Sequence, residues 1–207
     1  MTLPTVILFS DLPAAHLPVG GISLTVRHLK ELYKHGTREF YLCGVNAIPS
    51  TMQQARLPDD VIVHVMPHDR EALPCQLRAL LTIPDDLLLV RGDCLVDPRL
   101  FADLLSRTAP HWLPAPPATA GTLPAAARLS HIQLDIWAAA GIEQWLHHSP
   151  MLRPEMLDDY SPAHRGPVPF YVLTVTTPEE ARIATWTLIR AAQKLSLIHI
   201  SEPTRRS

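Results

Sequence analysis

The chain has 207 residues, enough for one domain, and 47% hydrophobic against 18% charged residues provides for a packed core. The formal net charge is −2 and no block of Lys and Arg precedes the C-terminus, which argues against nucleic acid as a partner. The apolar runs are shorter than the roughly 20 residues that span a bilayer, and the N-terminus lacks the basic start of a signal peptide. We therefore expect a cytoplasmic protein, in which Cys43, Cys75 and Cys94 are reduced thiols.

Strand and helix patterns alternate along the chain. Apolar runs of strand length predict buried strands at 5–11, 38–45, 61–67, 86–93 and 169–175. Helical spacing predicts helices at 22–36, 71–83 (after Pro74), 97–107, 125–141, 142–150 and 177–194, whereas 110–124 resembles a loop. This alternation predicts a three-layer α/β/α sandwich with a mostly parallel, Rossmann-like sheet over residues 1–194.

The loop after the first strand is one candidate site. In the stretch DLPAAHLPVGG, Gly20 and Gly21 directly precede a helix, where backbone N–H groups can bind an anion. His16 is the only side chain of this loop that could carry a positive charge. The pattern is neither GxGxxG nor a Walker loop, and a histidine in such a loop is more often incidental than functional.

Asp93 is the strongest single candidate. It follows a buried strand and a glycine, and in an open α/β sheet ligands bind beyond the carboxyl ends of the strands. A carboxylate there can hold Mg²⁺, or it can cap the turn into the next helix. The pair His147–His148 is typical of solvated residues at a helix end, and Cys94 is typical of a small buried residue.

Three segments together resemble the nucleotidyltransferase-like domain of the GT-A type. This family includes sugar-phosphate and inositol-phosphate nucleotidyltransferases and the molybdenum cofactor guanylyltransferases. HLPVGGISLTVRHLKELYKHGTREFYLCG looks like the family's PK-L-PV-G-PL loop, helix and second strand. LLLVRGDCLVDPRLFADLL looks like its GD metal strand and following helix, and VLTVTTPEEARIATWTLIRAAQK looks like its closing D-V-D-T-P-E-D strand and helix.

The resemblance implies a reaction and also shows where this chain departs from it. The phosphate of a phosphorylated sugar or polyol would attack the α-phosphorus of a nucleoside triphosphate and release pyrophosphate, with Asp93 holding Mg²⁺. The family's loop lysine falls at Ala15 or His16, and Thr174 and Thr176 stand where its closing aspartates would be. Phosphoryl transfer needs the triphosphate charge neutralised by metal and cationic groups. We therefore expect a degenerate nucleotide loop, and we assign no catalytic residue.

The end of the chain carries two further resemblances. The helix at 181–194 is especially similar to one that, in fusion proteins, leads into a membrane-embedded CDP-alcohol phosphatidyltransferase. This similarity gives an alternative function, a non-catalytic module that accompanies such a domain on the cytoplasmic face of a membrane. The string LSLIHISEPTRRS, residues 195–207, resembles a translated sequencing adapter, so we expect the natural sequence to depart from this one near Lys194.

Overall fold

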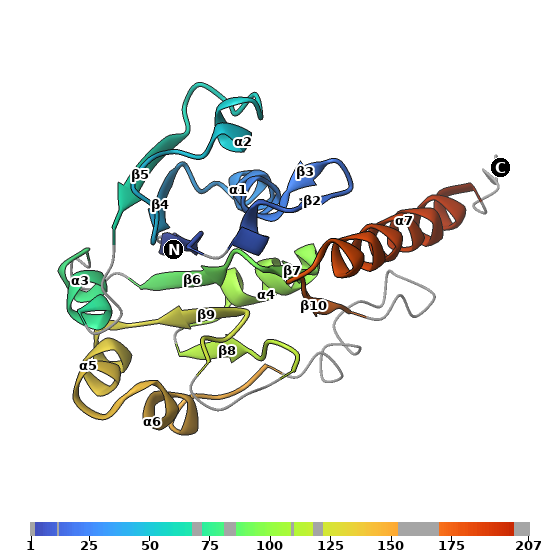
Figure 1. Ribbon diagram of the computed structural model, residues 1–207. Helices are drawn as coiled ribbons and strands as arrows, with labels where there is room; N and C mark the ends of the chain where they lie inside the picture. Colours follow the sequence, from blue (N-terminus) through green and yellow to red (C-terminus); the bar gives the residue numbers. More distant parts are fainter. Residues whose placement is uncertain are drawn as a thin grey trace, which may run out of the picture.

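A central sheet of six strands in the order β5-β4-β1-β6-β9-β8 organises the computed structural model of the chain (Figure 1). The structure describes residues 3–11, 13–67, 72–80, 86–108, 110–117, 122–152 and 170–200, the last of these without the side chains of 193–200. Parallel pairing joins β5 (Ile62–Met66), β4 (Glu39–Cys43), β1 (Thr5–Phe9) and β6 (Leu87–Arg91). The antiparallel strands β9 (Ala126–Leu129) and β8 (His111–Leu113) extend the sheet beyond β6.

Two small antiparallel sheets lie outside the central one. A turn of tight geometry joins β2 (Pro18–Val19) to β3 (Ile22–Ser23), after the short 3₁₀ helix η1 (Pro13–His16). The second pair consists of β7 (Cys94–Val96) and β10 (Val172–Thr174), which come from distant parts of the sequence.

Helices cover both faces of the central sheet. Successive residues of a strand point to opposite faces, so Val6 and Leu8 of β1 pack in one core cluster and Ile7 and Phe9 in another. The first cluster contains side chains of α1 (Leu24–Lys34), α2 (Ser50–Gln53) and α4 (Pro98–Ser106). The second contains side chains of α3 (Leu73–Leu80), α5 (His131–Ala140) and α6 (Ile142–His147). These two cores confirm the predicted three-layer α/β/α sandwich.

The predicted place of the last strand is wrong. Residues 169–175 were expected in the central sheet, but β10 pairs with β7, with Val172 opposite Val96 and Thr174 opposite Cys94. Residue 169 lies outside the described residues. The pairing partner is a three-residue strand that follows Asp93 directly, and nothing in its sequence separated it from the helix that comes next.

Two predicted elements near the sheet edge are also wrong. The expected helix at 125–141 divides into β9 and α5 at Ser130, whose backbone N–H and hydroxyl both bond Gln133. The alanines of β9 favour a helix locally, but pairing with β6 and β8 holds them in a strand. The buried Arg128 of this strand also pairs with Asp86 at 3.0 Å. The loop expected at 110–124 contains β8.

The last helix, α7 (Pro178–Ile200), starts as predicted. The Glu180 N–H donates to Thr177 Oγ1 at 3.2 Å, and the Thr177 N–H donates to Glu180 Oε2 at 3.0 Å, which confirms the capping box. The helical backbone continues past Lys194, and 201–207 lie outside the described residues. α3 begins at Leu73, one residue before the predicted Pro74, and the expected continuation at 81–83 lies outside the described residues. Among the described residues, no helix is both long enough and apolar enough to cross a membrane.

Removal of residues 195–207 should leave the thermal midpoint of unfolding nearly unchanged. The buried cluster around Val19 and Leu24 takes Ala181 and Ala184 from α7, with Leu188 packed against it, all before the proposed boundary. Differential scanning calorimetry of the full and shortened chains measures this difference. A loss of many degrees on truncation would show that the tail is a structural element.

Candidate functional site

A buried ion pair occupies the end of β6, where sequence analysis placed a metal ligand. Asp93 is 1% exposed. The Arg91 guanidinium donates through Nε to Asp93 Oδ1 at 2.8 Å and through Nη2 to Oδ2 at 2.6 Å. Its Nη1 donates to the Leu123 carbonyl at 3.0 Å, which fixes the guanidinium from the other side. Both carboxylate oxygens of Asp93 are therefore engaged in a bidentate pair, the geometry that arginine forms best.

The charges of this pair satisfy each other. Burial alone would lower the pKa of Arg91, but the hydrogen-bonded charge of Asp93 raises it above the ordinary value, so the guanidinium stays charged. Any metal ion bound by Asp93 would have to displace it. Within the described parts of the chain, His, Cys, Asp and Glu side chains form no group of three that could hold a metal. The Mg²⁺ expected from the resemblance does not fit the residues as they are arranged.

The first loop packs directly on the turn that contains Asp93. A Cβ on Gly92 would lie 2.2 Å from the Phe9 carbonyl oxygen and 2.7 Å from the Ala15 Cβ, so only glycine allows this approach. Ala15 is fully buried, and its carbonyl accepts from Thr25 Oγ1 at 3.1 Å. A glycine before a strand-end aspartate can leave room for a ligand to approach the backbone. In the structure that room is taken by the loop of the chain itself.

The other candidate residues of that loop, His16 and the two glycines, take part in contacts and a turn within the chain. The ring of His16 lies half-buried, with Nε2 3.2 Å from the Ser10 carbonyl oxygen. Gly20 and Gly21 adopt φ values of 61° and 84° in the β2–β3 turn, which explains why glycine is needed at both positions. The Gly20 N–H donates to Thr185 Oγ1 of α7 at 2.9 Å, so one of the two N–H groups predicted to bind phosphate is already bonded within the chain.

The segment that follows the closing strand β10 lies beside Asp93. The Val175 N–H donates to the Asp93 carbonyl at 2.7 Å. The Thr174 hydroxyl donates to the Pro116 carbonyl, and the Thr176 hydroxyl donates to Glu180 Oε2 at 2.7 Å. The threonines that stand in the aspartate positions therefore bond within the chain.

Sequence analysis missed His28, which supports the segment after Asp93. Its Nε2 donates to the Cys94 carbonyl at 2.6 Å, and its ring meets Phe101 edge to face. Burial lowers the pKa of His28 to about 4, so the ring is neutral at pH 7. The available signal was spacing, because His28 lies four residues from both Leu24 and Leu32 on the buried face of α1.

The remaining chemical candidates behave as predicted. Burial raises the pKa of Cys94 to about 12, which keeps the thiol protonated and inert. His147 and His148 are exposed at the end of α6, and His148 Nδ1 lies 2.7 Å from the Gln144 carbonyl oxygen.

Comparison with known proteins identifies the class of fold. No protein-family model matches the chain, and no curated protein does. A 4-diphosphocytidyl-2C-methyl-D-erythritol synthase from Anaerococcus prevotii superposes with a TM-score of 0.60 at 10% identity, covering 91% of this chain and 97% of that one. An inositol-1-phosphate CTP transferase from T. maritima gives 0.54 at 9% identity, covering 91% and 96%. A UDP-glucose pyrophosphorylase from Acinetobacter baumannii gives 0.54 at 11% identity, covering 95% and 100%. The chain has the nucleotidyltransferase fold.

Replacement of Asp93 by alanine should lower the free energy of unfolding by about 3–5 kcal/mol, because it leaves the Arg91 guanidinium half-buried without its partner. Asp135→Ala is the matched control, since its pair with Arg78 at 3.2 Å is exposed and should contribute at most about 1 kcal/mol. Urea titration measures both. Equal, small losses would show that the Arg91–Asp93 pair is not structural.

The stability of the fold should fall as the pH drops from about 6.5 to about 4. His28 is neutral in the folded chain, with a pKa of about 4, whereas an unfolded histidine titrates near 6.5. Within this window the unfolded state binds the extra proton, so stability rises with pH by up to about 1.4 kcal/mol per unit. His28→Gln should flatten the curve of unfolding free energy against pH. Parallel curves for the two proteins would refute the buried neutral ring.

Proposed function

We propose that this chain is a nucleotidyltransferase-like domain in which an internal arginine has taken the place of the metal ion, so that metal-dependent nucleotidyl transfer is lost. The proposal rests on the bidentate contact of Arg91 with both carboxylate oxygens of Asp93. A guanidinium supplies one fixed positive charge to the carboxylate. Unlike Mg²⁺, it has no open coordination position for a phosphate oxygen.

The charge balance around the site supports the same proposal. A nucleoside triphosphate needs metal and cationic side chains to offset its charge. Arg91 is already paired with Asp93, and Ala15, one of the two positions at which the family's loop lysine falls, is buried against Gly92. Asp11 adds a further carboxylate whose charge acts on Arg91. A triphosphate at this edge of the sheet would therefore meet no unpaired cation among these residues.

Assays with CTP, GTP, UTP or ATP and a panel of sugar and inositol phosphates should detect no Mg²⁺-dependent release of pyrophosphate. Arg91→Ala should free Asp93, so Mg²⁺ should raise the thermal midpoint of this variant and leave that of the wild type unchanged. The matched control is Arg99→Ala, because Arg99 forms the same kind of pair with Asp97, at 2.6 Å, at the start of α4. Robust wild-type turnover that disappears in Asp93→Ala would show that the chain is an active nucleotidyltransferase and contradict the proposal.

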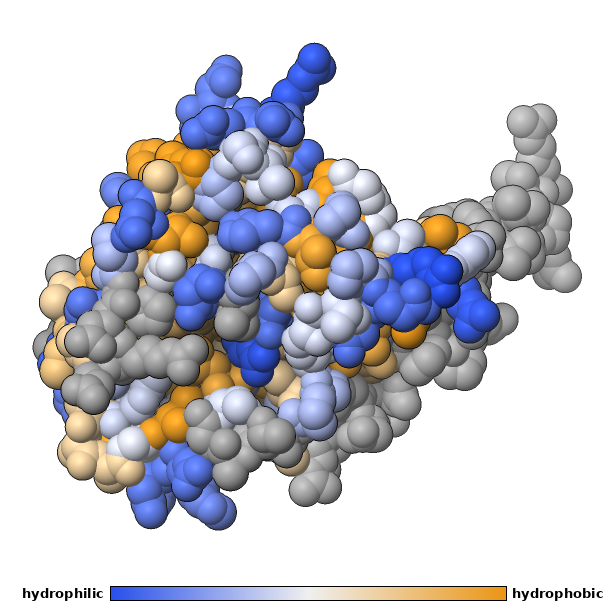
Figure 2. Space-filling model, viewed as in Figure 1, coloured by the Kyte–Doolittle hydropathy of each residue, from blue (hydrophilic) through white to orange (hydrophobic). Residues whose placement is uncertain are grey.

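The second candidate function is a non-catalytic module that packs against a membrane-embedded CDP-alcohol phosphatidyltransferase domain. Helix α7 supports it: Ile183, Trp186 and Ile189 are 53%, 58% and 39% exposed, at a spacing that places them on one side of the helix. Figure 2 shows hydrophobic side chains among charged ones along this helix. Its opposite side, with Ala184 and Leu188, packs on the body of the domain.

Substitution of Trp186 by glutamate tests this second function. In a protein that joins this domain to a phosphatidyltransferase domain, the change should lower phosphatidyltransferase activity, because it places a charge in the contact between the two domains. It should leave the unfolding of the present chain unchanged within about 0.5 kcal/mol, since the side chain is exposed. Full activity of that two-domain protein with Trp186→Glu would exclude α7 as the contact surface.

A further inference from the structure

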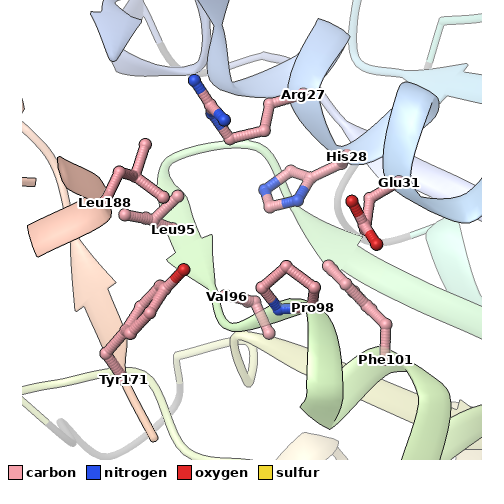
Figure 3. Close-up of a pocket in the computed structure, with 9 residues that line it drawn as sticks. All are labelled: Arg27, His28, Glu31, Leu95, Val96, Pro98, Phe101, Tyr171 and Leu188. Atoms are coloured by element: carbon pink, nitrogen blue, oxygen red, sulfur yellow. The ribbon is translucent and has the colours of Figure 1, made fainter. Parts of the chain in front are cut away.

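A small cavity lies apart from the Arg91–Asp93 pair, where α1, β7, the start of α4, Tyr171 and α7 meet (Figure 3). Its volume is about 30 Å³. Leu95, Val96, Phe101 and Leu188 contribute apolar walls. Four side chains bring polar groups to it: Arg27, His28, Glu31 and Tyr171, of which His28 already donates to the Cys94 carbonyl.

Arg27 is a cation without a carboxylate partner. Its Nη2 donates to the Val19 carbonyl at 2.5 Å, and its Nε is buried without any hydrogen bond. Among the described residues it forms no ion pair, although Glu31 lies near enough to act on its charge. Burial lowers the pKa of Arg27, opposed by the charges of Tyr171 and Glu31. Desolvating a guanidinium without full compensation is unfavourable, and a bound anion would relieve that cost.

The glycine turn holds Arg27 in this position. A Cβ on Gly20 would lie 2.9 Å from Arg27 Nη2, so glycine leaves the room that the guanidinium needs. The Val19 carbonyl accepts from the guanidinium, and the Gly20 N–H is tied to Thr185 of α7. The turn and α7 thus position a side chain that the local sequence pattern did not single out.

Tyr171 supplies a neutral hydrogen-bond donor. Figure 3 shows its hydroxyl directed toward the cavity. Burial raises the pKa of Tyr171 to about 12, with the charge of Asp97 acting in the same direction, so the hydroxyl keeps its proton at neutral pH. Arg27 and Tyr171 together offer the two kinds of donor that oxyanion sites use.

We propose that this cavity binds the carboxylate end of a small molecule, with Arg27 as the charged partner and Tyr171 as the second donor. A volume of about 30 Å³ accommodates about two water-sized atoms, the number of oxygens in a carboxylate, and the rest of the ligand lies outside. Glu31 lies at the cavity as well and is tied to Lys34 at 2.7 Å. Its charge repels a second negative charge, so a monoanionic carboxylate binds in preference to a phosphate dianion.

Titration of the whole chain with sodium acetate, followed by amide NMR at constant ionic strength with sodium chloride, tests this proposal. Saturable shifts should appear at Leu95 and Val96, and inorganic phosphate should bind more weakly than acetate. Arg27→Gln should weaken acetate binding about tenfold or more, and Tyr171→Phe should weaken it several-fold. Arg38→Gln is the matched control, because Arg38 pairs with the exposed Asp60 on another surface, and it should bind acetate like the wild type.

The spectra themselves show whether each variant is folded. If Arg27→Gln does not fold, Tyr171→Phe still tests the proposal, because it removes only a hydroxyl. Absence of saturable shifts in the wild type, or equal binding by wild type and both cavity variants, would overturn the proposal. Tighter binding of phosphate than of acetate would overturn the assignment of a carboxylate. These outcomes do not depend on pyrophosphate release, so this test and that of the proposed function fail separately.

Discussion

The carboxylate of Asp93 is almost completely buried at the end of the central strand β6, where an unpaired charge would be costly. Arg91, two residues earlier on the chain, neutralises it through two hydrogen bonds. Neighbouring segments then pack on this pair: the first loop closes on Gly92, and the closing strand is tied to the Asp93 carbonyl through Val175. The packing at this edge of the sheet therefore depends on a buried charge that is balanced within the chain.

The structural neighbours share the fold of this chain, but the likeness does not extend to its individual residues. The three neighbours named above match most of the chain at 9–11% identity, which establishes the fold and leaves the chemistry to individual residues. At the positions where the family resemblance implies metal-binding carboxylates, side chains bond within the protein: Asp93 to Arg91, Thr174 to Pro116, and Thr176 to Glu180. The proposed loss of metal-dependent nucleotidyl transfer rests on these internal bonds.

Periodicity predicted the parts of the fold that depend on local pattern. The four parallel strands, the helices α1, α3 and α4 and the capping box at Thr177 are signalled by short-range hydrophobic spacing and cap residues, whereas the short helix α2 was not predicted. The place of β10 and the strand character of 126–129 depend on pairing with distant segments, which no local pattern records. Alanines in particular form a helix or a buried strand according to their neighbours.

The site shows the same division between local and distant information. Asp93 was identified because it follows a buried strand and a glycine, but the sequence LLLVRGD gave no sign that Arg91 would turn toward it. Gly20 was identified as a glycine at the end of the first loop whose N–H could bind an anion, whereas the contact of that N–H with Thr185, 165 residues away, could not be predicted. His28 looked like part of an ordinary amphipathic helix, and only the packing of α1 on β7 reveals the bond to Cys94.

The most direct test of this account is the Arg91 Nε–H signal in ¹⁵N NMR spectra during titration with Mg²⁺, alone and with CTP. Because Arg91 Nε donates to Asp93 Oδ1 in a buried site, its proton should exchange slowly and give a distinct resonance, assigned by its loss in Arg91→Lys. If Arg91 stays paired with Asp93, this resonance should stay in place throughout the titration. Its shift or disappearance on addition of Mg²⁺ and CTP would show that Asp93 releases the arginine to bind metal, which would contradict the account.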